Sequence, residues 1–232
     1  LAITFTNKAA REMRDRVDTL IGEAAHDIWL STFHAFCARL LRVEIEHLGG
    51  YEKNFVIYDA SDSKGLIREC LKELNLDEKH TAPGAVQAHI SDAKNRLLGV
   101  KQFTVQAEDF FSQQVAKVYE LYQSKLAANN ALDFDDLLML TVELLSKNEA
   151  VRTKYQEKFR YILVDEYQDT NGAQYQITKL LAAGHHNICV VGDADQSIYG
   201  WRGADMRNIL NFERDYPEAT VILLEQNYRS TK

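Results

Sequence analysis

Short apolar runs alternate with longer amphipathic stretches at both ends of the chain. The apolar runs are bounded by polar or turn residues and are short, so they predict strands, whereas the stretches between them predict helices. The predicted strands are residues 1–5, 28–33, 161–164, 188–191 and 220–224. The predicted helices are residues 8–20, 34–47, 133–145, 173–183 and 206–216. Strands that alternate with helices indicate an α/β fold with a parallel sheet and helices on both faces.

The middle of the chain has a different pattern. Leu66, Ile67, Cys70, Leu71 and Leu74 recur at helical spacing after a cluster of capping residues at 59–62, and residues 85–98 and 108–129 also favour helices. No convincing strand is visible between residues 59 and 132. We therefore expect an all-helical insertion in this part of the chain.

Composition and charge exclude several classes of protein. The chain has 232 residues, of which 46% are hydrophobic and 26% are charged, as in ordinary globular proteins. It has neither a long apolar run nor a basic N-terminal region followed by an apolar stretch, so we expect no membrane span and no signal peptide. Three scattered cysteines fit a reducing cytoplasm. Because the chain starts without Met inside a predicted strand and ends without a structural stop, we expect a fragment of a larger protein.

The net charge of −7 does not indicate a nucleic-acid partner. Acidic residues outnumber basic ones in residues 1–55, 56–132 and 133–232 alike. Such a partner has to be argued from local features.

Two adjacent carboxylates, Asp165 and Glu166, follow a predicted strand and precede Tyr-Gln-Asp-Thr. In nucleotide hydrolases the first of two such carboxylates holds magnesium, and the second orients the attacking water. The alternative is a buried strand that runs into a polar turn, with Asp169 or Thr170 capping the next helix. The sequence Gln-Asp-Thr after the acid pair favours the nucleotide site.

A segment rich in exposed aromatic residues follows the next predicted strand. It places Gln196, Tyr199, Trp201 and Arg202 between glycines. Aromatic rings stack on unpaired bases, at about 1–3 kcal/mol per base, so the segment is a candidate for binding single strands. The alternative is that Tyr199 and Trp201 anchor the loop to the core.

Polar residues also gather where predicted helices begin. Thr6 and Asn7 stand at one helix N-terminus and Thr32 and His34 at another. Such ends can seat phosphate groups, although simple helix capping explains the same residues. The acid-rich segment from Asp133 to Asp136 is explained by a helix N-terminus and needs no metal.

Six strings occur in order over nearly the whole chain: ITFTNKAAREM, STFHAFCARLLR, LDFDDLL, VDEYQDTN, VVGDADQSIYGWRGAD and LEQNYRST. Together they resemble the superfamily 1 DNA helicases of the UvrD/Rep/PcrA group. The resemblance implies a RecA-like lobe of the P-loop NTPase type at residues 1–55 and 133–225, a helical subdomain inserted at 56–132, and the start of a second lobe at 226–232. It also implies an ATP-dependent 3′–5′ helicase that moves along single-stranded DNA and unwinds duplexes in repair or replication.

The resemblance implies roles for individual residues. Asp165 would bind Mg²⁺, Glu166 would activate water, and Gln196 would sense the γ-phosphate of ATP. Arg229 would reach that phosphate and Tyr228 would stack on adenine. The residues expected along the DNA path are Phe5, Thr6, Asn7, Thr32, His34, Tyr199, Trp201 and Arg202. The expected cofactors are ATP and Mg²⁺, and the expected partners are single-stranded DNA, single-strand/duplex junctions and DNA repair proteins.

One departure from the family pattern limits these expectations. The phosphate-binding sequence G-x-x-x-x-G-K-[S/T] does not occur in this chain, so the nucleotide site is incomplete and we expect negligible ATPase activity from the chain alone. The alternative function is a non-hydrolysing module that binds DNA or a repair partner. Codons upstream of residue 1 would separate the two, by encoding either the missing loop or a start codon. The helicase interpretation also requires Asp165 and Glu166 to be accessible at the same sheet edge as Gln196.

Overall fold

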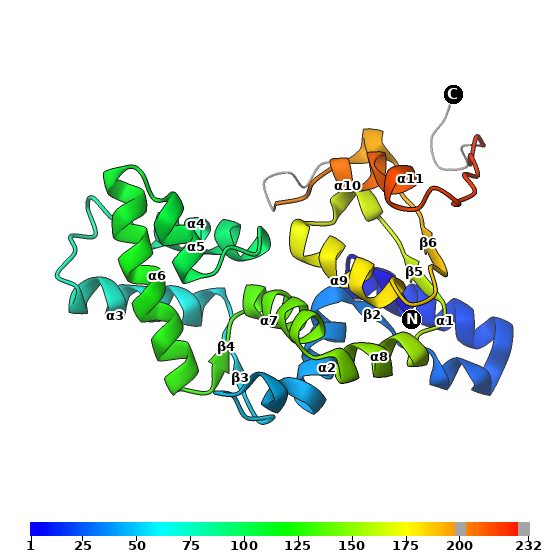
Figure 1. Cartoon of the computed structure of the whole chain (residues 1–232), viewed down its shortest axis with the longest axis horizontal. Coiled ribbons are helices and arrows are strands. Elements are labelled where there is room, and N and C mark those ends of the chain that lie inside the picture. Colours follow the sequence, from blue (N-terminus) through cyan, green and yellow to red (C-terminus); the bar gives the residue numbers. More distant parts are fainter. Residues whose placement is uncertain (198–202, 227–232) are drawn as a thin grey trace.

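The chain forms a four-stranded parallel sheet flanked by helices, seen in a computed structural model that describes residues 1–197 and 203–226 (Figure 1). The strand order is β2-β1-β5-β6. The bounds are Ala2–Thr4 for β1, Leu30–Thr32 for β2, Ile162–Val164 for β5 and Ile188–Val190 for β6. The predicted α/β class with a parallel sheet is confirmed. Since all four strands run in the same direction, their carboxyl ends meet at one edge.

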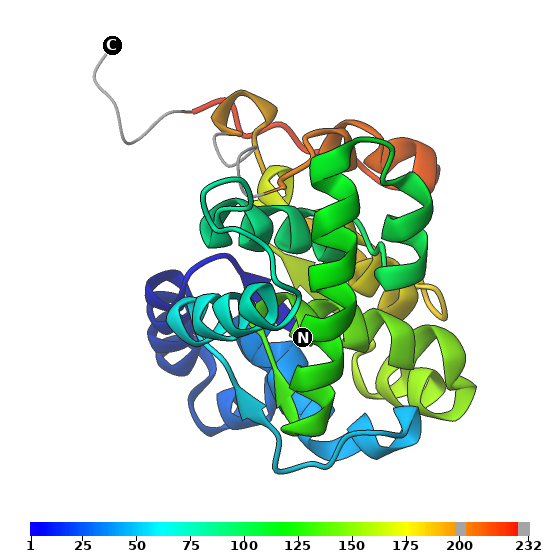
Figure 2. The same ribbon diagram turned by 90° about the vertical axis from the view of Figure 1, so that its left-hand side faces the viewer.

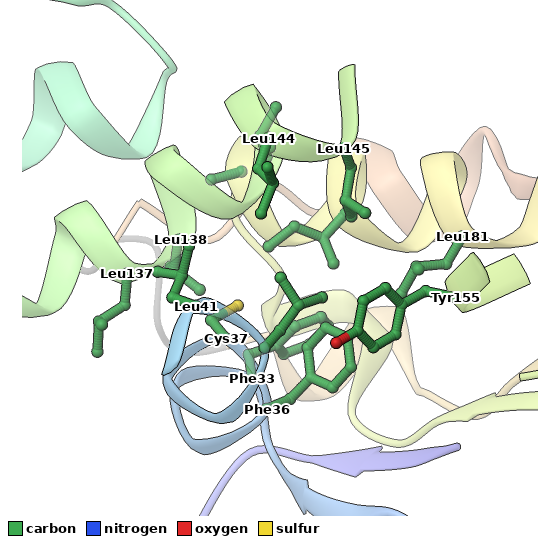
Figure 3. Close-up of a cluster of buried hydrophobic side chains, with 14 of the residues drawn as sticks. Phe33, Phe36, Cys37, Leu41, Leu137, Leu138, Leu144, Leu145, Tyr155 and Leu181 are labelled. Atoms are coloured by element: carbon green, nitrogen blue, oxygen red, sulfur yellow. The ribbon is translucent and has the colours of Figure 1, made fainter. Parts of the chain in front are cut away.

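Helices lie on both sides of this sheet. The helix α1, Asn7–Ile21, lies against β1 and β2 on one side. On the other side are α2 (Phe33–Glu44), α7 (Phe134–Lys147), α8 (Glu149–Lys158) and α9 (Gly172–Ala182). Figure 3 shows aromatic and aliphatic side chains of α2 facing the leucines of α7, with Tyr155 and Leu181 beside them. Burial of these apolar side chains, with those of Ile3, Ile162 and Val164 from the strands, forms the larger core.

On the face of the sheet against which α1 packs, the strands β5 and β6 carry exposed side chains. Leu163 is 51% exposed and Cys189 is exposed. The strand predicted at residues 220–224 is wrong, because this segment has no regular structure and Leu224 is 83% exposed. A strand needs a neighbouring backbone to satisfy its N–H and C=O groups, and in the described part of the chain no strand pairs with this segment or with the outer edge of β6.

A second, smaller core lies in the helical part of the chain, which stands beside the sheet in Figure 1 and in front of it in Figure 2. Its helices are α3 (Ala60–Glu73), α4 (Pro83–Asn95), α5 (Val100–Gln106) and α6 (Phe110–Ala128). The expectation of an all-helical insertion over 56–132 is wrong at its base. There β3 (Val56–Ile57) pairs in parallel with β4 (Ala131–Leu132), so the first and last residues of the insertion form a short two-stranded sheet.

The remaining elements are short. The segment predicted as one helix at 206–216 forms two, α10 (Arg207–Leu210) and α11 (Phe212–Asp215), which are separated at Asn211. The helix α8 has no counterpart among the predicted helices. Short 3₁₀ helices are Gly22–Asp27, Ile45–Leu48, Tyr167–Asp169 and Ala194–Gln196. No helix in residues 1–197 and 203–226 has both the length and the apolar content needed to cross a bilayer.

A buried ion cluster joins the helical part to the sheet part. The ammonium group of Lys94 on α4 lies 2.7 Å from carboxylate oxygens of both Asp133 and Asp136 at the start of α7. The hydroxyl of Tyr122 donates to Asp133 at 2.9 Å. Burial and the neighbouring Asp133 carboxylate raise the pKa of Asp136 to about 7. Burial opposes ionisation of Asp133, but the Lys94 ammonium outweighs it and lowers the pKa of that carboxyl.

Candidate functional site

The acid pair lies where β5 ends, at the carboxyl edge of the sheet. Asp165 is half-buried, its N–H donates to the carbonyl of Ile3 at 2.9 Å, and its carboxylate accepts from the hydroxyl of Thr4 at 3.4 Å. Glu166 is exposed and has a left-handed backbone, with φ 51° and ψ 42°. This conformation is costly for a residue other than glycine, so the surrounding contacts must hold it. Since Asp165 is half-buried and Glu166 is exposed, the acid pair is accessible.

Buried Gln168 fixes the carboxylate of Glu166. Its amide nitrogen donates to Glu166 Oε2 at 2.7 Å, and its amide oxygen accepts from the backbone N–H of Asp193 at 3.1 Å. Only 1% of Gln168 is exposed. Since a buried amide is costly to leave without partners, the two hydrogen bonds lock the end of β5 to the loop after β6.

Gln196 lies at the same edge and joins this network. Its amide nitrogen donates to Asp193 Oδ2 at 2.8 Å. This bond, and a second from the N–H of Asp195, lower the pKa of Asp193. Glu166, Gln168, Asp193 and Gln196 thus form one hydrogen-bonded series, which we call the edge relay. The proximity that the helicase interpretation requires is present.

The loops that carry the edge relay are also joined through their backbones. The N–H of Tyr167 donates to the carbonyl of Val191 at 2.9 Å, and that of Asp205 donates to the carbonyl of Thr170 at 2.9 Å. A Cβ atom at Gly192 would overlap the amide oxygen of Gln168. Glycine at this position therefore allows the loop after β6 to approach the buried amide.

Thr6 and Thr32 cap helices. The hydroxyl of Thr6 accepts from the N–H of Ala9 at 3.1 Å, and that of Thr32 accepts from the N–H of Ala35 at 3.3 Å. Capping is thus an observed role of both residues, and a phosphate contact stays a prediction for both. Asn7 is exposed beside Thr6.

A pocket of about 550 Å³ separates the sheet edge from α4. Phe5 and His34 line it from the sheet side, and Asn95 lines it from α4. The ring of His34 packs edge-on against Phe134, with 5.8 Å between centroids, and burial lowers the pKa of this histidine. Phe134 is 49% exposed, and it is an aromatic neighbour of the predicted DNA residues.

Sequence reasoning missed the contribution of the helical part to this pocket. Polar groups of Ser91, Asn95, Asp135 and Asn171 line it together. A signal was present in the adjacent Lys94 and Asn95 at the end of an amphipathic helix, but only the fold shows which segments they face. Five predicted residues lie outside the described residues: Tyr199, Trp201, Arg202, Tyr228 and Arg229.

The donor atoms at the end of β5 fit a magnesium ion. Mg²⁺ prefers oxygen ligands and takes one or two carboxylates together with phosphate and water, and Asp165 offers such a carboxylate beside the Thr4 hydroxyl. Within residues 1–197 and 203–226, no group of three or more His, Cys, Asp or Glu side chains forms a cage for a metal ion. The carboxylates of Asp133 and Asp136 are instead occupied by Lys94.

Comparison with known proteins identifies the family. Residues 1–217 match the model of the UvrD/REP helicase N-terminal domain. The chain belongs to this family. It is 56% identical over 232 residues to the ATP-dependent DNA helicase PcrA of Staphylococcus aureus (strain Mu50 / ATCC 700699), and 55% identical to that of Bacillus subtilis (strain 168). Each alignment covers 100% of this chain but 32% and 31% of the relative, so the chain spans about a third of the length of these UvrD-type helicases.

Proposed function

We propose that this chain is part of an ATP-dependent 3′–5′ DNA helicase that couples ATP hydrolysis to movement on single-stranded DNA and duplex unwinding, in repair or replication. The edge relay from Glu166 to Gln196 carries the proposal, because it joins the acid pair to the loop that leads into the aromatic segment. We place the first RecA-like lobe at 1–55 and 133–225, the helical subdomain at 56–132 and the start of the second lobe at 226–232.

The acid pair would divide the chemistry of hydrolysis. Asp165 would hold Mg²⁺, which supplies charge neutralisation at the phosphates of bound ATP. Glu166 would accept a proton from the attacking water, and Gln168 would keep its carboxylate in place. Gln196 would respond to the γ-phosphate and pass its movement to the aromatic segment through the loop that both share. Tyr228 and Arg229 would contact adenine and the γ-phosphate.

The DNA path would follow the carboxyl edge of the sheet. Phe5 and His34 border the pocket and can contact bases, while Thr6, Asn7 and Thr32 stand at helix N-termini, which favour phosphate. Tyr199, Trp201 and Arg202 would extend this path. Single strands and their junctions with duplex are the proposed partners, with DNA repair proteins as further ones.

The chain alone is expected to lack helicase-level turnover. The sequence contains no G-x-x-x-x-G-K-[S/T] loop, so the β- and γ-phosphates of ATP would lack their backbone cradle and lysine. Steady-state ATPase of the 232-residue chain with single-stranded DNA measures this. Turnover at the rate of an intact helicase would refute the expectation.

The proposed chemistry is tested by Glu166→Gln in a full-length helicase that contains this chain. Removing the base should lower the ATPase rate by about 10²–10⁴-fold, and nucleotide binding should persist because the phosphates are held by other groups. Glu157→Gln, on the exposed side of α8, is the matched control and should keep full activity. ATP turnover by the Glu166 variant at the control rate would exclude Glu166 as the base.

A further inference from the structure

The side chain of Asn95, at the end of α4, is hydrogen-bonded to its own helix and to two other segments of the molecule. It is 9% exposed. Its amide nitrogen donates to the carbonyl of Ser91 at 2.9 Å and to Asp135 Oδ1 at 3.2 Å, and its oxygen accepts from the amide nitrogen of Asn171 at 2.5 Å. Every polar atom of this amide is therefore used, so small shifts of its neighbours change its hydrogen bonding.

The orientation of both amides follows from the helix cap at Asn171. The oxygen of Asn171 accepts from the N–H of Gln174 at the start of α9 at 2.9 Å. Its amino group must then face Asn95, which in turn must present its oxygen there and its amino group to Asp135. Reversing either amide would break the cap or oppose two like groups. The contact is thus specific for this pair of residues.

Asn171 connects directly to the segment that carries the acid pair. Between it and Glu166 lie only the turn Tyr167–Asp169 and Thr170. The carbonyl of Thr170 accepts from the N–H of Asp205 at 2.9 Å and from the side-chain amide of Asn208 at 3.0 Å. Asn171 is therefore linked to the acid pair by a short stretch that is itself held by hydrogen bonds.

The backbone at Gly203 also lies near Asn95. This glycine directly follows the aromatic segment in the sequence and has φ +78°. A Cβ atom added to it would lie 3.6 Å from Cβ of Asn95 and 3.9 Å from Cβ of Asn171. Gly203 thus lies close to the same two asparagines.

Asn95 also faces the pocket that Phe5 and His34 line, from the opposite wall. Its position is anchored by the adjacent Lys94, whose ammonium is buried between Asp133 and Asp136. A group that enters the pocket would therefore contact Asn95. The adjacent Lys94 anchors this residue, and a hydrogen bond to Asn171 connects it to the segment of the acid pair.

We propose that Asn95 is a positioning residue through which occupancy of this pocket by a DNA base acts on the segment of the acid pair. The inference rests on the proposed helicase function. It assigns to the helical subdomain a direct part in stimulation of ATP hydrolysis by DNA. The subdomain acts through one amide, in addition to the edge relay.

The test measures ATPase rates with and without single-stranded DNA in a full-length helicase that contains this chain. Asn95→Ala should reduce the stimulation by DNA about three- to tenfold, while the rate without DNA and the KM for ATP stay within about twofold. Asn129→Ala is the matched control, because this exposed asparagine of the same subdomain donates to Tyr58, which also belongs to that subdomain. It should keep full stimulation.

A charge-conserving exchange separates positioning from simple structural support. Asn95→Asp alone places a carboxylate against Asp135 and should lose stimulation. Combining it with Asp135→Asn restores one donor and one acceptor between these positions and should recover at least half of the stimulation. Full stimulation in Asn95→Ala, an equal loss of the rate without DNA, or no recovery in the double variant would overturn the proposal. A wild-type enzyme without any DNA-stimulated ATPase would instead refute the proposed function.

Discussion

Replacing Lys94 by methionine tests the ion cluster that joins the two cores. The substitution keeps most of the side-chain volume but removes the only cation within 2.7 Å of the Asp133 and Asp136 carboxylates in the described structure. Lys94 and Asp136 are each 1% exposed, so water cannot solvate the carboxylates after the ammonium group is removed. Removing one partner of a buried ion pair costs about 3–5 kcal/mol, and we expect a loss of unfolding free energy in this range at pH 8.

The loss should shrink as the pH falls. The pKa of Asp136 is raised to about 7 in the folded chain, so between about pH 4 and 7 the folded state holds a proton that the unfolded state has released. The folded state then binds more protons, and stability falls as pH rises through this window, by up to about 1.4 kcal/mol per pH unit. Without Lys94 the buried Asp133 should also retain its proton. The slope in the variant should therefore approach about 2.7 kcal/mol per pH unit.

Urea unfolding followed by circular dichroism at pH 5.5 and pH 8 measures the loss of unfolding free energy and its change with pH. Lys125→Met is the control, because Lys125 forms an ion pair of the same length, 2.7 Å, with Glu73, which is 56% exposed. That variant should change stability little, as surface pairs do. A loss below about 1 kcal/mol at pH 8 for Lys94→Met, or a loss that grows on acidification, would refute the reasoning.

Three further predictions concern the sheet edge and its neighbours. Gly192→Ala should lower the unfolding free energy by about 1–3 kcal/mol, because the added methyl group would overlap the Gln168 amide. Gly65→Ala, where the methyl group has open space, should not lower it. Equal urea midpoints for the two variants would contradict this. In a full-length helicase, Trp201→Ala should weaken single-strand binding by about 1–3 kcal/mol per stacked base and reduce DNA-stimulated ATPase with the melting temperature unchanged, and unaltered DNA-stimulated kinetics would exclude stacking. A thiol reagent should modify exposed Cys189 rapidly in the native chain and the two buried cysteines only in urea, which labelling followed by mass spectrometry checks.

Much of the fold was predictable because the apolar pattern of a segment reflects its own burial. The four strands of the larger sheet, and the helices α1, α2, α7 and α9, follow from runs and spacings that any parallel sheet would require, whereas α8 was not predicted. The strand at 220–224 failed for a different reason. Its apolar run satisfies the pattern, but pairing depends on a neighbouring strand, and no described strand lies beside it. The break at Asn211 and the β3–β4 pair likewise depend on how distant segments pack.

The sequence by itself determined the acid pair and its position at a strand end, because adjacent carboxylates after an apolar run belong to one local segment. It also determined that Gln196 would reach the same edge, since parallel strands end together. The contacts that give this edge its form were decided by tertiary structure. Gln168 meets Asp193 because β5 and β6 pair in the sheet, and Asn95 meets Asn171 across 76 residues because the helical part packs against the sheet part. Such contacts leave no periodic trace in the sequence, since each is a single polar side chain whose partner lies on another element.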